Sequence, residues 1–174
     1  PDGVISPEYD RVLLGGSLPH YMFGLTFNAA YKGWDFGLTL QGVGSQKSQI
    51  SAAMIEGLRD NWLNFPTILD GNYWSPKNTD EQNATAKYPR LTRTNRDANF
   101  CMSDYWLYNG RYIRLKNLSV GYTLPKAWTT KACMNTVRLY VSGSDLFTIS
   151  NAPKGWDPEV STEGYPITTS LIFG

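Results

Sequence analysis

The residue types that most often carry catalysis are few in this sequence. The one histidine, His20, stands alone beside Pro19 at the start of an expected strand, where a solvated or hydrogen-bonded imidazole is the ordinary role. Asp157 and Glu159 in the run GWDPE are close enough to resemble the carboxylate pair of general acid–base chemistry. A turn fixed by Pro158 explains their spacing better. We therefore predict no catalytic residue and no enzyme.

Metal binding has as little support. Cys101 and Cys133 form no CxxC pair, and the chain has one histidine, so the sequence gives no support for a zinc site. The carboxylates of Glu8 and Asp10 follow an Asp-Gly pair, but these are too few oxygen ligands for calcium, and a polar loop is the simpler interpretation. We predict no metal and no cofactor.

Composition narrows the class of protein. The chain has 174 residues, 41% of them hydrophobic and 14% aromatic, with a net charge of +1. No segment concentrates enough basic charge for nucleic acid. No apolar run approaches the roughly 20 residues of a membrane helix, although a membrane strand needs only about 9–11. Because the sequence begins PDGVISPEYD, without Met or a signal peptide, we expect it to be a piece of a longer chain.

Residues 21–43 carry the clearest pattern, strict alternation of apolar and small polar side chains, interrupted by Lys32-Gly33. Such alternation predicts two β-strands joined by a tight turn. Residues 111–148 predict a second hairpin, with its connection at 125–135, and 166–174 predict the start of a final strand. The alternation changes parity around Lys116, which indicates a β-bulge or, if the strand crosses a membrane, the rim where it leaves the membrane. In between, residues 51–63 predict a short amphipathic helix.

This pattern suits either a soluble β-sandwich or a membrane barrel. Aromatic residues lie at the ends of the apolar faces, where Tyr and Trp prefer the boundary between water and hydrocarbon. The opposite faces carry Thr, Asn, Gly and Gln rather than the Lys and Glu of a solvated sheet. We therefore favour a barrel in which these side chains face lipid: Tyr21, Phe23, Leu25, Phe27, Trp34, Phe36, Leu38, Leu40, Val120, Tyr122, Leu139 and Val141.

The connections alternate in length, short at 32–33 and 125–135 and long at 44–110 and 149–165. Outer-membrane barrels have short periplasmic turns and long extracellular loops. We therefore expect the long connections outside the cell, together with residues 1–20 as the end of a further loop. Cys101 and Cys133 would then lie on opposite sides of a core about 30 Å thick, too far apart for a disulfide.

Three stretches in order and spacing identify a family resemblance: DRVLLGGSLPHYMFGLTFNAAYKGWDFGLTLQGV, YNGRYIRLKNLSVGYTLPK, and VRLYVSGSDLFTISNAPKGWDPEVS followed by GYPITTSLIFG. Together they closely resemble the C-terminal end of SusC-like (RagA-like) TonB-dependent outer-membrane transporters of Bacteroidetes. The resemblance covers about residues 10–174 and is weakest over 45–100. The family's plug domain, most of its strands and its terminal aromatic residue are missing from this sequence.

The resemblance implies an all-β fold: the last five or so antiparallel strands of a transmembrane barrel of about 22 strands. It further implies import of a glycan or peptide nutrient across the outer membrane of a Gram-negative bacterium. The implied partners are TonB, acting through the missing plug, and a SusD-like surface lipoprotein that covers the mouth. It also makes GWDPE a structural loop motif.

Aromatic rings in the long loops are the candidates for ligand contact, because a flat ring can stack on a sugar or peptide face. They are Trp62, Tyr73, Trp74, Trp106 and Trp156. Loop packing or contact with the lid protein is the alternative role for each. Two other functions stay open: a soluble carbohydrate-binding β-sandwich, whose apolar faces would meet in a dry core, and a surface enzyme, which would need convergent carboxylates.

Overall fold

The computed structural model describes residues 6, 8–51, 55–56, 65–94, 99–161 and 163–174. The chain divides into two compact units, Pro1–Gly15 with Gln49–Leu107, and Gly16–Ser48 with Tyr108–Gly174. The helix expected over 51–63 falls almost entirely outside the described residues. Within the described ranges, no helix is long and apolar enough to cross a membrane.

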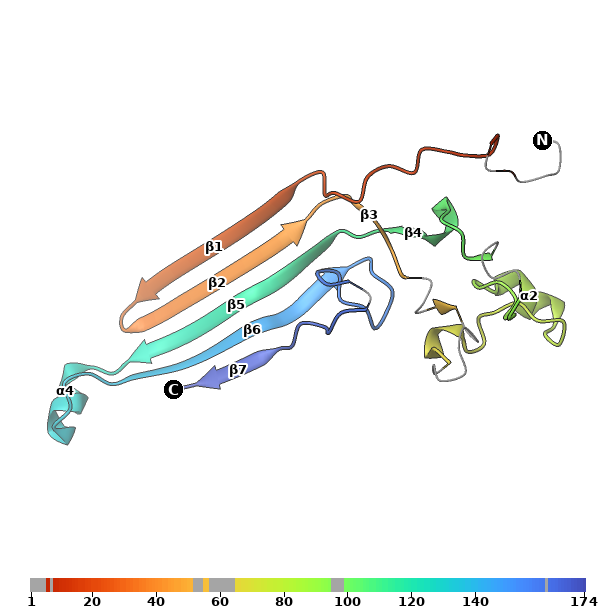
Figure 1. Ribbon diagram of the computed structural model, residues 1–174. Helices are drawn as coiled ribbons and strands as arrows, with labels where there is room; N and C mark the ends of the chain where they lie inside the picture. Colours follow the sequence, from red (N-terminus) through yellow and green to blue (C-terminus); the bar gives the residue numbers. More distant parts are fainter. Residues whose placement is uncertain (1–5, 7, 52–54, 57–64, 95–98, 162) are drawn as a thin grey trace. The chain divides into compact units, whose positions relative to one another are not determined.

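The second unit contains a five-stranded antiparallel sheet in the order β1-β2-β5-β6-β7, whose strands lie side by side in one layer (Figure 1). The strands are β1 (Met22–Tyr31), β2 (Trp34–Val43), β5 (Tyr112–Thr123), β6 (Arg138–Ser150) and β7 (Ser170–Phe173). The predicted antiparallel sheet is therefore confirmed. Two short strands, β3 (Lys47–Gln49) and β4 (Leu107–Asn109), form a separate two-stranded sheet.

The turn between β1 and β2 is set by its two residues. Lys32 has φ +47° and Gly33 has φ +88°, so both central positions are left-handed, as the hairpin turn that matches strand twist requires. A side chain at Gly33 would also meet the Thr123 carbonyl oxygen at 2.8 Å. This local requirement fixes the register of the hairpin, in which Tyr31 pairs with Trp34 and Phe23 with Gly42.

The register places the predicted apolar residues on one side of the sheet. One cross-strand row passes through all five strands in the order Ala29, Phe36, Val120, Val141 and Phe173. These side chains are not packed in a core: Val141 is 46% exposed and Phe173 72%. Among the described residues no second sheet covers this side, whereas a β-sandwich needs one.

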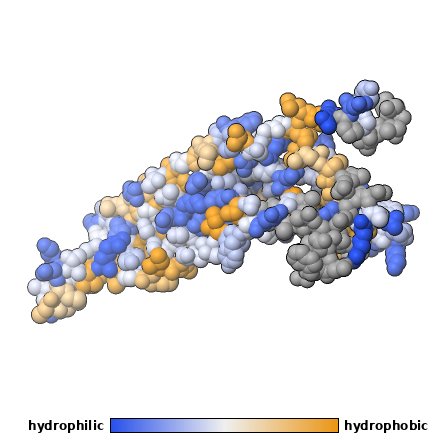
Figure 2. Space-filling view, viewed as in Figure 1, coloured by the Kyte–Doolittle hydropathy of each residue, from blue (hydrophilic) through white to orange (hydrophobic). Residues whose placement is uncertain are grey.

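The other side of the sheet is polar, with Asn28, Gly37, Ser119 and Ser142 in one cross-strand row. In Figure 2, hydrophilic residues gather over the middle of the sheet and hydrophobic residues show along its margins. The few buried hydrophobic residues of the unit, Val43, Tyr112 and Leu115, lie at the end of the sheet near the long loops. The sheet is therefore two-faced, with little core of its own.

The irregularity expected at Lys116 is a β-bulge. Leu40 of β2 pairs with Leu115, while Thr39 pairs with Asn117, so Lys116 is the extra residue. Because of this extra residue, Leu115 lies on the same side of the sheet as Leu118 and Val120, although its sequence position has the opposite parity. A second irregularity faces it in β6, between Ser144 and Phe147.

The β6 bulge reverses the sides of two neighbouring residues. Asp145 has φ +52°, and its carboxylate reaches Lys116 on the polar side of the sheet. The next residue, Leu146, lies over Gly143 instead: a Cβ placed on Gly143 would be 2.5 Å from a Leu146 methyl carbon. Alternation alone would have put the carboxylate on the apolar side.

The connection between β5 and β6 is more structured than a simple turn. It contains α4 (Lys126–Thr129) and a 3-10 turn, η3 (Thr130–Ala132), and it ends in Cys133 with φ +55°. The two strands are joined beyond this excursion by a hydrogen bond from the Leu124 N–H to the Val137 carbonyl. Sequence alternation did not predict this helix, because four residues are too few to show a helical period.

The first unit contains η1 (Thr67–Leu69), α2 (Asp80–Thr85) and η2 (Asp104–Trp106). Thr79 caps α2: its side chain accepts from the Gln82 N–H, while the Gln82 side chain accepts from the Thr79 N–H. This reciprocal capping box starts a six-residue helix that buries no side chain. Cys101 of this unit and Cys133 of the other are both exposed thiols.

Candidate functional site: an ion-pair network on the polar side of the sheet

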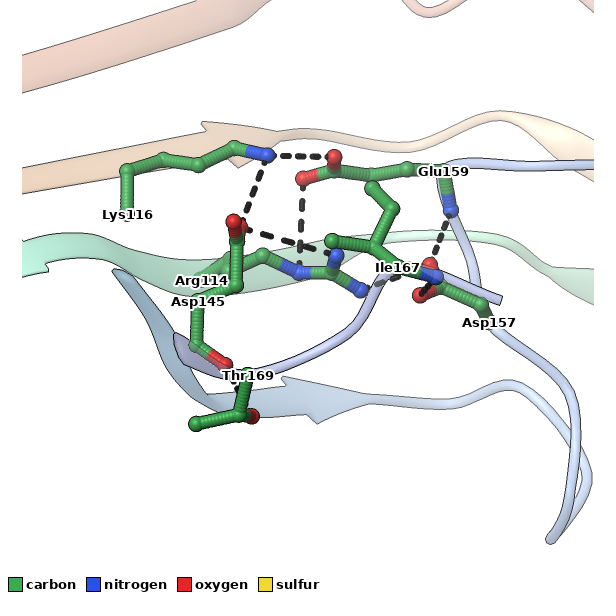
Figure 3. A network of polar contacts seen from close by, with 7 residues as sticks. All are labelled: Arg114, Lys116, Asp145, Asp157, Glu159, Ile167 and Thr169. Atoms are coloured by element: carbon green, nitrogen blue, oxygen red, sulfur yellow. Dashed lines mark hydrogen bonds and ion pairs between the residues drawn. The ribbon is translucent and has the colours of Figure 1, made fainter. Parts of the chain in front are cut away.

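Five charged side chains meet on the polar side of the sheet, near the end that carries the long loops (Figure 3). Two cations come from β5, and three carboxylates come from the β6 bulge and from the loop 151–169 that joins β6 to β7. The members are Arg114, Lys116, Asp145, Asp157 and Glu159. The network thus connects a strand to a loop more than 40 residues further along the chain.

The contacts within the network differ in length. Arg114 donates from its terminal nitrogen to Asp157 Oδ1 at 2.6 Å, and Lys116 Nζ donates to Glu159 Oε2 at 2.6 Å and to Asp145 Oδ1 at 3.0 Å. The other approaches of Arg114 are looser, 3.5 Å from Nε to Glu159 Oε1 and 3.8 Å from Nη1 to Asp145 Oδ1. The guanidinium is therefore surrounded by carboxylates but makes one short ion pair.

Burial gives this network its energetic weight. The Arg114 side chain is 3% exposed and that of Asp157 is 7% exposed, so both charges are removed from water. A buried charge is tolerated only when partners compensate for its lost hydration. Three carboxylates against two cations leave a formal charge of −1, so the cluster can hold the loop but does not attract a further anion.

Asp157 organises the loop through both carboxylate oxygens. Oδ1 accepts from the Glu159 N–H at 2.9 Å as well as from Arg114, and Oδ2 accepts from the Ile167 N–H at 3.1 Å. Burial opposes ionisation of this carboxyl, but these donors outweigh it and hold the pKa of Asp157 below its ordinary value. One ionised side chain thereby ties the interior of the loop to β5 and to Ile167, close to the start of β7.

Asp145 ties the network to the start of the last strand. Its backbone carbonyl accepts from the Thr169 hydroxyl at 2.8 Å, one residue before β7 begins. The bulge at Asp145 therefore serves two contacts, a carboxylate toward Lys116 and a carbonyl toward Thr169. The turn interpretation of GWDPE was incomplete, since its carboxylates also bind the two cations of β5.

A second ion pair lies on the same side of the sheet, toward the turns. Arg138 of β6 donates from Nε to Asp35 Oδ1 at 2.9 Å and from a terminal nitrogen to Asp35 Oδ2 at 2.6 Å. The pair crosses over β5 at Gly121, where a Cβ would be 2.6 Å from both partners. Arg138 also lies 4.9 Å from the centre of the Tyr140 ring. Both charged side chains remain partly exposed, so this pair contributes less than the buried network.

The aromatic residues predicted to contact ligand occupy two different units. Tyr73, Trp74 and Trp106 belong to the first, where Trp106 stacks on Phe100 at 5.2 Å and donates from its indole nitrogen to the Asn99 carbonyl. Tyr73 packs edge-on against Phe65, and Trp74 is exposed. Trp62 lies outside the described residues.

Trp156 belongs to the sheet unit and lines an open pocket of about 360 Å³. Arg114, Asp157 and Thr148 line the same pocket, so its wall is largely polar. Trp156 thus lies beside Arg114 and Asp157 of the ion-pair network. Its role in ligand binding stays a prediction.

Arg114, Lys116 and Asp145 were not recognised from the sequence as members of a site. A signal was present in RYIRLKN, because two cations two residues apart on an otherwise uncharged strand face require anionic partners. The sequence did not show which carboxylates those partners are. Within the described ranges, no group of three or more His, Cys, Asp or Glu side chains is arranged so that it could hold a metal ion.

Comparisons with known proteins agree with this two-faced sheet. No family model matches the chain. TonB-dependent receptor P3 of Formosa agariphila is 34% identical over 87% of this chain, and TonB-dependent receptor SusC of Bacteroides thetaiotaomicron is 26% identical over 88%. In each case the chain spans about 14% of the relative's length.

Among solved structures, the RagAB peptide importer in its closed-closed state aligns with 90% of this chain at a TM-score of 0.62 and 23% identity. The open-open state aligns with 82% at a TM-score of 0.58 and 24% identity. The chain spans 17% and 15% of those chains, and the likeness shows a shared fold.

The antiparallel sheet with its long loops is thus a segment of an outer-membrane-type barrel. The chain belongs to the family of TonB-dependent receptors, and SusC is among its relatives. Its relatives are receptors rather than enzymes. The predicted resemblance is confirmed.

Proposed function

We propose that this chain is the C-terminal barrel portion of an outer-membrane transporter that imports a glycan or peptide nutrient. TonB energises the whole protein through a plug outside this segment, and a SusD-like lipoprotein caps its extracellular mouth. The observation that carries the proposal is a single-layered sheet with a bare apolar side and a polar side, in a chain related to TonB-dependent receptors.

The dimensions of the sheet support this arrangement. The ten residues of β1 span about 33 Å at roughly 3.3 Å each. A strand tilt of about 40° reduces this to about 25 Å, the height of the apolar band on outer-membrane barrels. Aromatic pairs mark both ends, with Trp34 and Tyr122 at 4.7 Å and Tyr21 and Phe23 at 6.4 Å between ring centres. These dimensions support the proposal that the twelve residues named from the sequence face lipid.

In this proposal the ion-pair network holds an extracellular loop at the lumen wall. Arg114 and Lys116 lie on the polar side, which would face the water-filled interior. Asp157 and Glu159 would then fix the loop 151–169 beside Trp156 at the mouth. The network has a positioning role and involves no covalent chemistry.

Growth and uptake test the transport function directly. Deletion of the gene in its host is expected to abolish growth on one glycan or peptide nutrient while growth on glucose is unchanged. Restoring the gene should restore uptake, and loss of TonB should remove it again. A deletion strain that grows normally on a full panel of glycans and peptides would contradict the proposal. Measured uptake of the nutrient, rather than growth alone, separates import from later metabolism.

The two cysteines test the topology. We expect a membrane-impermeant maleimide added to intact cells to label Cys101, in the loop 44–110, and not Cys133, in the connection 125–135. Both thiols are exposed, so a difference reports the side of the membrane rather than burial. The variants Cys101→Ser and Cys133→Ser assign the signal, and lysed cells give the control in which both thiols react. Equal labelling in intact cells would contradict the orientation.

A further inference from the structure

A groove of about 340 Å³ lies on the apolar side of the sheet, at the end that carries the long loops. Tyr21 and Phe23 form one wall, and Ile113 and Ile149 form the other. Phe23, Gly42, Ile113 and Ile149 occupy one cross-strand row, so the groove runs between neighbouring strands of a single sheet. No residue of the ion-pair network lines this groove.

Two glycines let the aromatic wall pack close to the sheet. Gly42 and Gly44 place no side chain between the aromatic wall and the isoleucine wall. The rings of Phe23 and Tyr21 lie over them instead: a Cβ on either glycine would be 2.2 Å from the ring above it. Neither glycine could carry a side chain without displacing a ring of this wall. Phe23, Ile113 and Ile149 are all exposed.

One cation lines the groove. Arg111 lies directly before β5 and continues its alternation, two residues from Ile113 on the same side. Its backbone is held by two hydrogen bonds, from its N–H to the Asn109 side chain and from the Asn151 N–H to its carbonyl. The Arg111 residue is exposed, and no carboxylate in the described ranges forms an ion pair with it. The lining itself contains no acidic residue.

We propose that this groove binds an anionic phosphorylated lipid, with one acyl chain between the two walls and the phosphate on Arg111. An apolar channel that ends at an unpaired guanidinium matches a molecule with an acyl chain and an adjoining phosphate. Arginine binds phosphate oxygens in a bidentate geometry, whereas a zwitterionic headgroup carries its own cation. The inference rests on the proposed function, because it requires this side of the sheet to face the membrane.

The test uses the full-length protein, purified in detergent and examined by native mass spectrometry. The probes are phosphatidylglycerol and phosphatidylethanolamine with identical acyl chains, so that only the headgroup differs. Phosphatidylglycerol should bind more tightly. In Arg111→Gln its affinity should fall about tenfold, as for loss of a charge-assisted hydrogen bond, while that of phosphatidylethanolamine should fall less, because its own ammonium already compensates its phosphate.

A matched control removes a cation elsewhere on the protein. Lys32→Gln, in the turn at the opposite end of the sheet, should leave the affinity for both lipids unchanged. Ile149→Trp fills the groove and should weaken both lipids by a similar factor, since it acts on the acyl chain. Inorganic phosphate should not compete at millimolar concentration, because it has no chain.

Three results would overturn the assignment: unchanged phosphatidylglycerol binding in Arg111→Gln, an equal loss in Lys32→Gln, or competition by inorganic phosphate. Failure of this inference is distinguishable from failure of the proposed function. A transporter that lacks this lipid site would still fractionate with the outer membrane and import its nutrient. A protein that is not a transporter would fail those two assays whatever its lipid binding.

Discussion

Arg114→Met should destabilise the folded protein by about 3–5 kcal/mol, the range seen when one partner of a buried ion pair is removed. Methionine keeps most of the apolar volume, but Asp157 would lose its cation in a place with little access to water, and Glu159 would keep only Lys116. Asp157 would retain its two backbone donors, while the approach of Arg114 Nε to Glu159 would be lost. The free energy of unfolding of the refolded full-length protein in a bilayer measures the effect.

Arg138→Met is the matched control, because it makes the same substitution on the same side of the sheet. The Arg138–Asp35 pair is partly exposed and screened by water, so its loss should destabilise the protein much less than the loss of Arg114. A double-mutant cycle between Arg114→Met and Asp157→Asn should show a coupling free energy, because the two side chains are in contact. Equal costs for the two arginine substitutions would contradict the assigned role of the buried network.

The network also predicts a local readout. In Arg114→Met the loop 151–169 should be cleaved by an added protease faster than in the wild type, because Asp157 no longer holds it against β5. Arg138→Met should leave that cleavage rate unchanged. Unfolding and cleavage together separate a general loss of stability from the release of one loop.

Leu38→Arg should cost about 2–4 kcal/mol, the penalty for a cation near the midplane on the lipid side of a barrel strand. Leu38 lies in the middle row of the apolar side, between Phe27 of β1 and Leu118 of β5. An arginine there would have to hold its charge in hydrocarbon or bend toward the headgroups. The yield of folded, heat-modifiable protein and its free energy of unfolding in a bilayer measure this cost.

The neighbouring position gives the control. Thr39→Arg introduces the same side chain one residue along the same strand, at nearly the same depth, on the polar side. We expect a cost below about 1 kcal/mol, since that side would face water. If both substitutions cost the same, lipid does not face Leu38, and the membrane assignment of the apolar side is wrong.

Part of this architecture was accessible from the residues alone. Alternation has a period of two, so a strand such as β1 shows its two faces within ten residues. Lys32-Gly33 carries its own turn geometry, because each residue's φ depends mainly on local contacts. The parity change at Lys116 indicated the bulge for the same reason. The family resemblance rested on the order and spacing of these local patterns.

The contacts of the site could not be predicted in the same way. Arg114 meets Asp157 across 43 positions of sequence, and Arg138 meets Asp35 across 103. Which carboxylate a cation meets depends on strand register, and a shift of one residue would move every side chain to the other side.

What the sequence by itself determined was therefore local: the strands, their two faces and the turn that joins the first pair. Tertiary structure decided that the β6 bulge turns Asp145 toward Lys116 and moves Leu146 to the apolar side. It also decided that Gly121 leaves room for Asp35 and Arg138 to meet over β5. The physical reason is that periodicity is a property of one strand, whereas an ion pair needs two distant segments held in a fixed register.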